Sequence, residues 1–343
     1  MNTTKLVETA QAMVAPGKGI LAADEGSATA QQRFDSIKVP CTEDNRRAYR
    51  ELLLTTPGME EFISGVILFD ETVRQSTSEG LPFPELLAGK GVVPGIKVDT
   101  GPHPLAGFPG ETVTEGLDGL RDQVGEYVSL GARFAKWRAV IRVDEQAGVP
   151  SHTCIDTNAH ALARYAAICQ EVGLVPIVEP EVLMEGSHDL CSCEAITEQV
   201  LRHVFAVLGE HRVLLEGIIL KPSMVIPGKQ SPNLATVEQV AEATVRCFRR
   251  TVPAAVPGIA FLSGGQSPEE ATAHLSAMNV LGDVPWELSF SYGRALQAPV
   301  LKAWSGKAEN AEAAQRAFHL RAQLNSSART GLYRADMESA EAA

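Results

Sequence analysis

Eight short apolar runs recur along the chain, and helix-like stretches separate most of them. Runs that are this short and apolar throughout are typical of strands buried on both faces. Strands that alternate with helices form parallel sheets, and eight such units favour a closed barrel over an open doubly wound sheet. We therefore predict an α/β fold, a single-domain (β/α)8 TIM barrel. The runs are GILAA (19–23), GVILF (65–69), PGIKV (94–98), ARFAKW (132–137), LVPIV (174–178), GIIL (217–220), GIAFL (258–262) and WELSF (286–290).

Capping motifs predict where some of the intervening helices begin. Thr236 and Gln239 have the spacing of a capping box, in which each side chain accepts a hydrogen bond from the backbone N–H of the other residue. Thr112 and Glu115 have the same spacing, ahead of an apolar stripe that ends at Gly131. We expect a helix to start at each of these pairs.

Length, charge and hydropathy exclude several classes of protein. The chain has 343 residues, of which we expect residues 1–334 to form the barrel and residues 335–343 a short polar C-terminal tail. Its net charge of −12 argues against nucleic-acid binding, and no run approaches the roughly 18 continuous apolar residues of a membrane span. The N-terminus lacks the pattern of a signal peptide. We therefore expect a cytoplasmic protein without a nucleic-acid or membrane partner.

The six cysteines are expected to be reduced, because long chains without a signal peptide are usually cytosolic. Cys191 and Cys193 lie near His188 and Asp189, but their spacing is not the two-residue gap of common zinc sites. We therefore expect a loop or a helix start in this segment and no metal site.

Charged residues lie in or just after most of the apolar runs. The carboxyl ends of barrel strands converge on one face, where barrel enzymes keep their active sites. A ring of charged side chains at these semi-buried positions is hard to explain by solvation alone. The pattern therefore predicts an active site at this face. Its charged candidates are, in chain order, Asp24, Lys97, Lys136, Arg138, Glu179, Glu181 and Lys221.

Lys221 is the strongest candidate for a nucleophile. It follows the apolar run 217–220, and Pro222, which has no N–H, ends the strand after it. Burial disfavours an ammonium ion, and a neutral amine attacks carbonyl carbon, which is the chemistry of Schiff-base enzymes. The alternative, a lysine whose side chain extends to solvent, is the commoner case for one strand taken alone.

Two pairs of like charges sharpen the prediction. Residues i and i+2 of an extended chain point to the same side, which places Lys136 beside Arg138 and Glu179 beside Glu181. Two carboxylates this close cannot both ionise freely, and this property suits a general acid/base. A lysine that faces Lys221 across the barrel would favour the neutral form of one of the two amines. The alternative is a structural ion pair, such as Lys136 with Glu179.

Two glycine-rich loops follow the last two runs. Ser263-Gly264-Gly265 and Gly293-Arg294 occupy the usual phosphate site of a barrel, where backbone N–H groups approach an anion closely. The guanidinium of Arg294 would add a bidentate contact. Lys97 and Arg138 stand roughly opposite in the ring and could hold a second phosphate. We therefore expect a substrate that is phosphorylated at both ends.

In order and spacing, several segments of the chain closely resemble those of class I fructose-bisphosphate aldolases. The resemblance runs from about Lys5 to about Tyr333. It implies a (β/α)8 enzyme without a metal or other cofactor, usually a homotetramer. Such an enzyme reversibly cleaves fructose 1,6-bisphosphate to dihydroxyacetone phosphate and glyceraldehyde 3-phosphate in glycolysis and gluconeogenesis. The segments are GILAADE, RRAYRELLLT, GVILFDET, GIKVDTG, FAKWR, LARYAAICQ, VPIVEPE, LLEGIILKP, FLSGGQS and FSYGRALQ.

The resemblance also implies catalytic roles for single residues. Lys221 aligns with the Schiff-base lysine of the family, and Glu179 aligns with its main general acid/base. Asp24 matches the carboxylate that orients the lysine and the C4 hydroxyl of the substrate. Lys136 and Glu181 match residues that tune this site.

The phosphate-binding positions carry over in the same way. Lys97 and Arg138 match positions on the C6-phosphate side. Gly26 stands where the family commonly has a serine, so one hydroxyl is lost there, and Thr29 can keep the other. The C1-phosphate pocket of the family corresponds to Ser263, Gly264, Gly293, Arg294 and Arg33.

The end of the chain also departs from the family. Animal members end in a tyrosine that helps to protonate the enamine, whereas this chain ends in Glu341-Ala342-Ala343 and its last tyrosine is Tyr333. We expect water or another group to deliver that proton. Three alternatives stay open: the same chemistry on fructose 1-phosphate or sedoheptulose 1,7-bisphosphate, a non-covalent barrel isomerase that uses Glu179 as its base, and a non-catalytic scaffold or binding protein.

Overall fold

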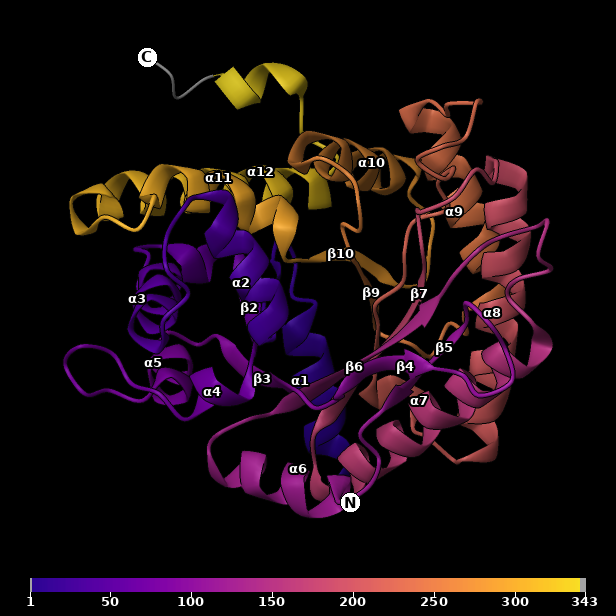
Figure 1. Ribbon diagram of the computed structural model, residues 1–343, viewed down its shortest axis with the longest axis horizontal. Helices are drawn as coiled ribbons and strands as arrows, with labels where there is room; N and C mark the ends of the chain where they lie inside the picture. The colour runs from indigo at the N-terminus through magenta and orange to yellow at the C-terminus, as the bar shows by residue number, and fades with distance from the viewer. Residues whose placement is uncertain (1, 340–343) are drawn as a thin grey trace.

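The computed structural model describes residues 2–339, which form a closed barrel of parallel strands (Figure 1). Around the barrel the strands follow in the order β1-β10-β9-β8-β7-β6-β3-β2. Each of the eight apolar runs contributes one strand, so the predicted (β/α)8 fold is confirmed. The strands are β1 (Gly19–Ala23), β2 (Ile63–Leu68), β3 (Val93–Lys97), β6 (Phe134–Ile141), β7 (Val175–Val182), β8 (Ile219–Leu220), β9 (Gly258–Phe261) and β10 (Glu287–Tyr292).

Helices surround the barrel and connect its strands (Figure 1). The capping box predicted at Thr236 and Gln239 is present and opens α9. No helix within residues 2–339 is long and apolar enough to cross a membrane. The helices are α1 (Thr3–Met13), α2 (Ser27–Ser36), α3 (Glu43–Leu54), α4 (Asp70–Val73), α5 (Phe83–Gly89), α6 (Leu120–Ser129), α7 (His152–Val172), α8 (Leu190–Glu210), α9 (Val237–Thr251), α10 (Pro268–Leu281), α11 (Arg294–Trp304) and α12 (Ala311–Arg329).

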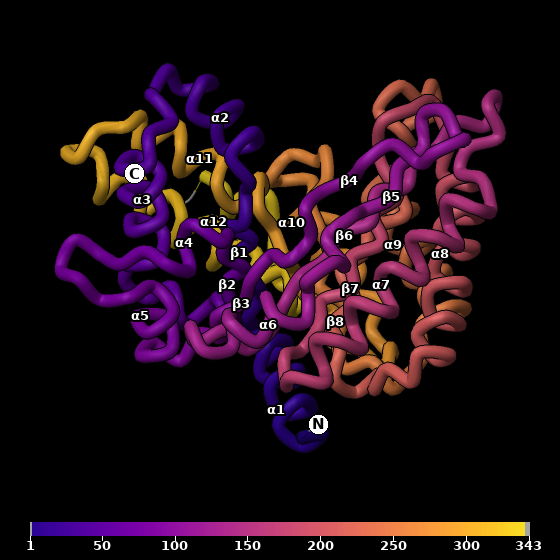
Figure 2. Tube along the Cα trace, turned by 60° about the horizontal axis from the view of Figure 1, so that its bottom comes forward, coloured from indigo at the N-terminus to yellow at the C-terminus, as the bar shows by residue number. Residues whose placement is uncertain are grey.

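Helix α1 covers the amino-terminal end of the barrel, as Figure 2 shows. Its buried face, with Leu6, Ala10 and Met13, belongs to the same apolar cluster as the barrel residues Ile20 and Phe134. Burial of these side chains stabilises the closed end of the barrel through the hydrophobic effect. The carboxyl ends of the strands are therefore the end at which a cleft can form.

Phe134 fills part of the barrel interior. A Cβ atom at Gly95 would lie 2.2 Å from the ring of Phe134, so the ring can take this place only because residue 95 is a glycine. Every residue of β2 and β7 is buried. Burial on both faces explains why the apolar runs of the sequence do not alternate with polar residues.

A two-stranded antiparallel sheet that the sequence did not predict lies beside β6. It pairs β4 (Gly101–Pro104) with β5 (Thr112–Glu115). The helix start predicted at Thr112 and Glu115 is therefore wrong, because this segment is a strand and α6 begins only at Leu120. The side chain of Thr114 donates a hydrogen bond to the carbonyl of Arg138 at 2.7 Å. Such long-range pairing overrides the local capping pattern, and threonine favours strands.

The chain after α12 is attached to that helix by a buried arginine. Residues Ala335–Ser339 form a short 3-10 helix, and the guanidinium of Arg321 lies 2.6 Å from the carboxylate of Glu338 in this segment. The hydroxyl of Tyr333 also donates to Glu338, at 2.9 Å. The boundary between barrel and tail after residue 334 stays a prediction. Residues 340–343, on which the expectation about the end of the chain falls, lie outside the described residues.

Candidate active site

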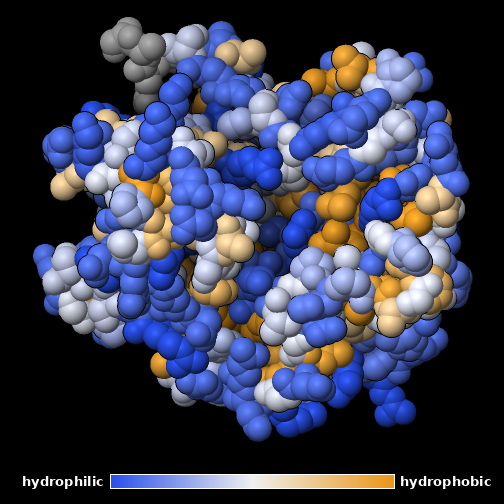
Figure 3. All heavy atoms as spheres, in the orientation of Figure 1, coloured by the Kyte–Doolittle hydropathy of each residue, from blue (hydrophilic) through white to orange (hydrophobic). Residues whose placement is uncertain are grey.

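A cleft of ≈ 990 Å³ opens at the carboxyl ends of the barrel strands. Figure 3 shows it as a hollow near the centre of the molecule, with hydrophilic residues inside. All the residues that were predicted to be catalytic or to bind phosphate line this one cleft, although they come from distant parts of the chain. They are Asp24, Thr29, Arg33, Lys97, Lys136, Arg138, Glu179, Glu181, Lys221, Ser263, Gly264, Gly293 and Arg294.

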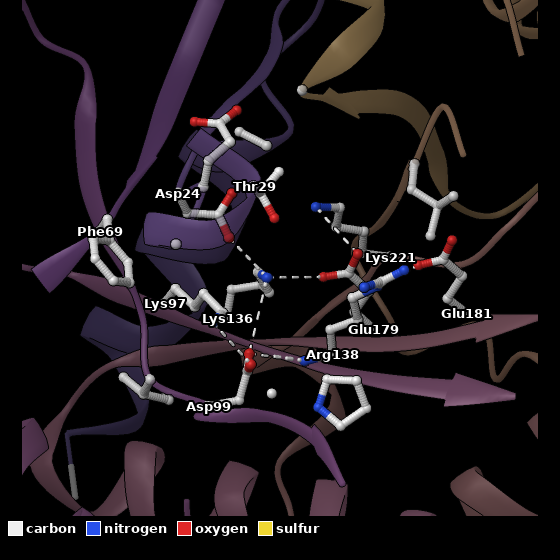
Figure 4. A pocket seen from close by; sticks show the side chains of 18 of the residues that line it. Asp24, Thr29, Phe69, Lys97, Asp99, Lys136, Arg138, Glu179, Glu181 and Lys221 are labelled. Atoms are coloured by element: carbon white, nitrogen blue, oxygen red, sulfur yellow. Dashed lines mark hydrogen bonds and ion pairs between the residues drawn. The ribbon is translucent and has the colours of Figure 1, made fainter. Parts of the chain in front are cut away.

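Lys221 lies directly after β8, where its backbone N–H donates to the carbonyl of Val178 at 2.8 Å. The residue is 4% exposed, and its Nζ lies 3.4 Å from Oε1 of Glu179 (Figure 4). The alternative of a lysine that extends to solvent is therefore wrong. An amine held in a cleft beside a carboxyl group is placed to attack a carbonyl substrate with a proton donor at hand.

Lys136 is the centre of a buried ion cluster (Figure 4). Its Nζ lies 2.7 Å from Asp24, 3.5 Å from Glu179 and 3.9 Å from Asp99. Burial alone would lower the pKa of this amine, but the three carboxylates outweigh burial and raise its pKa. Lys136 is therefore a fixed positive charge at neutral pH.

Asp24, which follows β1, is held in its ionised form. Burial alone would raise the pKa of its carboxyl, but the ammonium groups of Lys136 and Lys221 hold that pKa well below its usual range. Strand β1 is not a neighbour of β6 in the barrel, so the contact between Asp24 and Lys136 crosses the mouth of the barrel. An ionised carboxylate at this place can accept a hydrogen bond from a substrate hydroxyl.

Glu179 and Glu181 of β7 have different partners. The two oxygens of Glu179 divide between Lys221, at 3.4 Å, and Lys136, at 3.5 Å. Glu181 forms an ion pair with Arg138 of the neighbouring strand β6. Burial alone would lower the pKa of the Arg138 guanidinium, but the carboxylate of Glu181 raises that pKa. The ion pair considered between Lys136 and Glu179 is thus present, but as one part of a larger cluster. Glu179 therefore contacts both the candidate nucleophile Lys221 and the ammonium of Lys136.

Asp99 belongs to the site although it was not among the predicted site residues. It is 8% exposed, and its carboxylate lies 3.2 Å from Lys97 and 3.9 Å from Lys136. It also accepts a hydrogen bond from the backbone N–H of Arg138 at 3.3 Å. Asp99 follows Lys97 by two residues, and this spacing, which places both side chains on one side of an extended chain, was a signal available in the sequence.

The two predicted phosphate loops lie next to each other, because they follow the paired strands β9 and β10. Ser263, Gly264 and Gly265 form a turn, and no backbone carbonyl within residues 2–339 accepts a hydrogen bond from their N–H groups. Helix α11 starts at Arg294, and its N-cap, Gly293, has no side chain to satisfy the free N–H groups of the first turn. Free N–H groups and the positive end of a helix dipole both attract an anion.

Arg33 reaches the second of these loops from α2. One of its guanidinium nitrogens lies 3.6 Å from the Cβ position of Gly293. Glu25 holds Arg33 and also binds the buried Arg50. Burial alone would raise the pKa of the Glu25 carboxyl, but Arg50 and Arg33 hold that pKa below its usual range. No local sequence pattern could have predicted that Arg50 supports the site, because its partner Glu25 lies 25 residues away in the chain.

The C6-phosphate side of the family corresponds to Lys97, Arg138 and Thr29. Lys97 and Arg138 come from β3 and β6, which lie opposite β9 and β10 in the barrel order, whereas Thr29 comes from α2, the helix that also carries Arg33. The ammonium of Lys97 lies 5.9 Å from the ring centre of Phe69. Gly26 is the N-cap of α2 and leaves this helix end without a side-chain cap. A Cβ atom at Gly26 would lie 3.7 Å from Phe69, so the space for a serine side chain is present. The phosphate-binding roles of these residues stay predictions.

Within residues 2–339, no group of three or more histidine, cysteine, aspartate or glutamate side chains is placed to hold a metal ion. Cys191 and Cys193 lie in the first turn of α8, whose N-cap is Asp189, so the helix start considered there is confirmed. All six cysteines are free thiols.

Comparisons with known proteins agree with this arrangement. The family model "Glycolytic: Fructose-bisphosphate aldolase class-I" matches residues 5–343. The "Probable fructose-bisphosphate aldolase class 1" of Xanthomonas campestris pv. campestris is 58% identical over 335 residues, which cover 97% of this chain and 100% of the relative. "Fructose-bisphosphate aldolase 6, cytosolic" of Arabidopsis thaliana is 56% identical over 340 residues, 99% of this chain and 94% of the relative.

A solved structure gives the same result. Fructose-bisphosphate aldolase from Plasmodium falciparum, solved in complex with TRAP and a small molecule inhibitor, matches with a TM-score of 0.96 and 50% sequence identity. The match covers 96% of this chain and 95% of that chain. The family match, the identity to curated relatives and the shared fold agree, and the chain belongs to the class I fructose-bisphosphate aldolase family.

Proposed function

We propose that the chain reversibly cleaves fructose 1,6-bisphosphate to dihydroxyacetone phosphate and glyceraldehyde 3-phosphate through an imine on Lys221. The observation that carries this proposal is the buried amine of Lys221, 3.4 Å from Glu179, in a cleft that lysine and arginine side chains from other elements also line. Family membership supports the same substrate. No metal or other cofactor takes part in the proposed steps.

The first steps form the imine. The neutral amine of Lys221 attacks the C2 carbonyl carbon of the open-chain sugar and gives a carbinolamine. Glu179 donates the proton that allows water to leave, and its position between Lys221 and Lys136 makes it the nearest carboxyl group to the reacting nitrogen. The resulting iminium ion carries a positive charge on nitrogen and can accept an electron pair from the neighbouring carbon.

The next steps break the C3–C4 bond. Glu179, having lost its proton, removes the proton of the C4 hydroxyl, which Asp24 orients as an ionised carboxylate. The electron pair of the C3–C4 bond moves to the iminium, so glyceraldehyde 3-phosphate leaves and an enamine stays on Lys221. Lys136 stabilises the negative charge on Asp24 and Glu179 during this exchange. Protonation at C3 and hydrolysis of the imine release dihydroxyacetone phosphate.

The donor for protonation at C3 is proposed to be water or another group of the cleft. Tyr333, the last tyrosine of the sequence, lies in a groove formed with α9 and α10 and not in the cleft. Its hydroxyl is bound to Glu338. It therefore does not occupy the place that the family's terminal tyrosine would take.

The two phosphates of the substrate are proposed to bind at opposite ends of the cleft. The N–H groups of Ser263, Gly264 and Arg294 would bind the C1 phosphate, with Arg33 beside them. Lys97 and Arg138 would bind the C6 phosphate. Contacts to these remote groups fix the C2 and C4 atoms relative to Lys221, which is how binding energy assists a reaction.

Trapping the imine tests the proposal. The purified protein is incubated with dihydroxyacetone phosphate and borohydride, and the modified peptide is located by mass spectrometry. We expect a covalent adduct on Lys221, loss of cleavage activity on trapping, and neither adduct nor activity in Lys221→Met. Lys221→Arg serves as a control that keeps a long, nitrogen-containing side chain at this position and cannot form the imine. An adduct on another residue, or full activity of Lys221→Met, would contradict the mechanism; a non-covalent isomerase or a scaffold predicts no adduct.

Cleavage of fructose 1-phosphate or of sedoheptulose 1,7-bisphosphate is the second candidate activity. The absence of a hydroxyl at Gly26 favours it, because one contact to the C6 phosphate is missing. Measurement of kcat/KM for the three sugars decides between them, with the largest value expected for fructose 1,6-bisphosphate.

We further propose a homotetramer in the cytoplasm. The tetramer rests on the resemblance to the family, and the location rests on the cytosolic relatives of Arabidopsis thaliana. Light scattering on the purified protein measures the molar mass. A value near that of one chain of 36.7 kDa would contradict the tetramer.

A further inference from the structure

Lys229 lies in the loop between β8 and α9, outside the set of residues assigned to the cleft. Hydrogen bonds attach this loop to the loop after β7. The backbone N–H of Lys229 donates to the carbonyl of Met184 at 2.7 Å, and the N–H of Gly228 donates to the carbonyl of His188 at 2.9 Å. Met184 and its neighbour Glu185 both line the cleft. The backbone of Lys229 is therefore held next to the wall of the active site.

The side chain of Lys229 crosses the phosphate turn. A Cβ atom at Gly265 would lie 2.2 Å from Cε and 2.3 Å from Nζ of Lys229, and the third nearest atom also belongs to Lys229. Gly265 has no positive φ, so an alanine would fit its backbone. A side chain at position 265 would therefore have to displace the end of Lys229, which occupies that space.

The ammonium of Lys229 adds positive charge at the place where an anion is expected. It touches the last residue of the turn Ser263–Gly265, whose N–H groups have no backbone partner within residues 2–339. Its ion-pair partner is Glu185, at 3.3 Å, and the side chains of Lys229 and Glu185 are 38% and 59% exposed. Because water screens such a pair, the ammonium keeps much of its attraction for a second, doubly charged anion.

We propose that Lys229 is a positioning residue for the C1 phosphate: it holds the Ser263–Gly265 turn from outside and strengthens the turn's attraction for a phosphomonoester. This inference rests on the proposed function, because the turn is assigned to the C1 phosphate there. Every substrate or product with a phosphate on C1 should depend on Lys229 to the same extent. The C6 phosphate should not matter, since its candidate ligands Lys97 and Arg138 lie on the opposite wall.

Steady-state kinetics of Lys229→Met and Lys229→Arg test the proposal. Lys302→Met is the matched control, because it removes one exposed positive charge from α11 roughly 12 Å along the helix from Arg294. For Lys229→Met we expect KM to rise about 3- to 5-fold for fructose 1,6-bisphosphate and for fructose 1-phosphate alike, with kcat unchanged. Salt should reduce this difference, and Lys229→Arg should restore KM to within about 2-fold of the original chain.

A double-mutant cycle tests the contact itself. Gly265→Ala should displace Lys229 and raise KM, whereas the same change in a Lys229→Ala background should add little, because the clash is gone. Additive effects of the two substitutions would overturn the proposal. So would an unchanged KM in Lys229→Met, or an equal rise of KM in Lys302→Met. Melting temperatures of all variants are measured, and a rise in KM that tracks a loss of stability also counts against it.

Binding of inorganic phosphate separates this inference from the proposed function. Isothermal titration calorimetry on the full-length chain measures phosphate affinity without any reaction. A weaker affinity of Lys229→Met relative to the original chain supports the role of Lys229 even if no sugar is cleaved. Equal affinities of the two proteins overturn it even if the aldolase activity is confirmed.

Discussion

Replacement of Lys136 by methionine is the sharpest test of the ion cluster. Methionine has a similar length and fits a buried site, so the substitution removes the ammonium with little change in volume. The carboxylates of Asp24, Glu179 and Asp99, at 2.7, 3.5 and 3.9 Å from Nζ, then lose their shared positive partner. Lys136 is 4% exposed, so water cannot replace the lost charge.

The expected cost is large because the charges that remain are buried. Removal of one partner from a buried ion pair typically costs about 3–5 kcal/mol of folding stability. We expect Lys136→Met to lose about this amount at pH 7 and to lose at least about 100-fold in kcat, since Glu179 and Asp24 both depend on the ammonium. Lys90→Met is the control, because Lys90 pairs with the more exposed Glu60 at 3.1 Å and should cost only about 0–1 kcal/mol.

The pH dependence has a defined sign. The folded-state pKa of Lys136 is raised above 10.5, so its contribution to stability is present below 10.5 and is lost only as pH rises through the folded value. The folded-state pKa of Asp24 is depressed below 3.8, so its contribution is present above 3.8 and is lost as pH falls through the folded value. Both contributions are therefore present between about pH 5 and pH 9.

The stability of Lys136→Met, unlike that of the original chain, should change with pH between about pH 5 and pH 8. Without Lys136, the pKa of Asp24 in the folded protein rises, because the largest attraction on its carboxylate is gone. Proton uptake then relieves the repulsion among the carboxylates, so the stability gap between the original chain and Lys136→Met should narrow as pH falls from about 8 to about 5. Urea unfolding at several pH values measures the gap. Equal stability of the two proteins at pH 7, or a gap that widens toward low pH, would refute the reasoning.

Three further substitutions test other parts of the cleft. Asp99→Asn should raise KM for fructose 1,6-bisphosphate about 3- to 10-fold and leave KM for fructose 1-phosphate unchanged, because Lys97 loses the carboxylate 3.2 Å away that fixes it at the C6 side. Gly26→Ser should lower KM for fructose 1,6-bisphosphate by up to about 10-fold in the same assay, since it adds a hydroxyl at an open helix end. Arg50→Met should destabilise the fold by about 3 kcal/mol in urea unfolding, because it leaves Glu25 with one buried partner fewer.

The barrel could be predicted from the sequence because most residues of its strands are buried on both faces of the sheet. Burial of this kind produces continuous apolar runs, and each run marks its own strand. The hairpin β4–β5 could not be predicted in this way. Thr112 and Glu115 have the spacing of a capping box, and only the pairing with Gly101–Pro104 and the contact of Thr114 with β6 make the segment a strand.

The residues of the cleft could be predicted, but not their partners. Spacing placed Lys136 and Glu179 at neighbouring strand ends, whereas the shortest contact of Lys136 is to Asp24, from a strand that is not its neighbour. The place of Lys229 over Gly265 depends on loop conformation, and no local pattern reports it. Contacts across the mouth of a barrel join residues that are far apart in sequence, so local spacing cannot reveal them.

The unequal surroundings of Lys136 and Lys221 support the proposal that Lys221 is the nucleophile. Lys136 has three carboxylates within 3.9 Å of its Nζ, and they stabilise the ammonium form. Lys221, in contrast, has an ion-pair contact within residues 2–339 only to Glu179, which Lys136 shares. Lys136 therefore supplies the positive charge that these three carboxylates share. We propose that Lys221, which has one shared partner in place of three, is the lysine whose amine is available to form the imine.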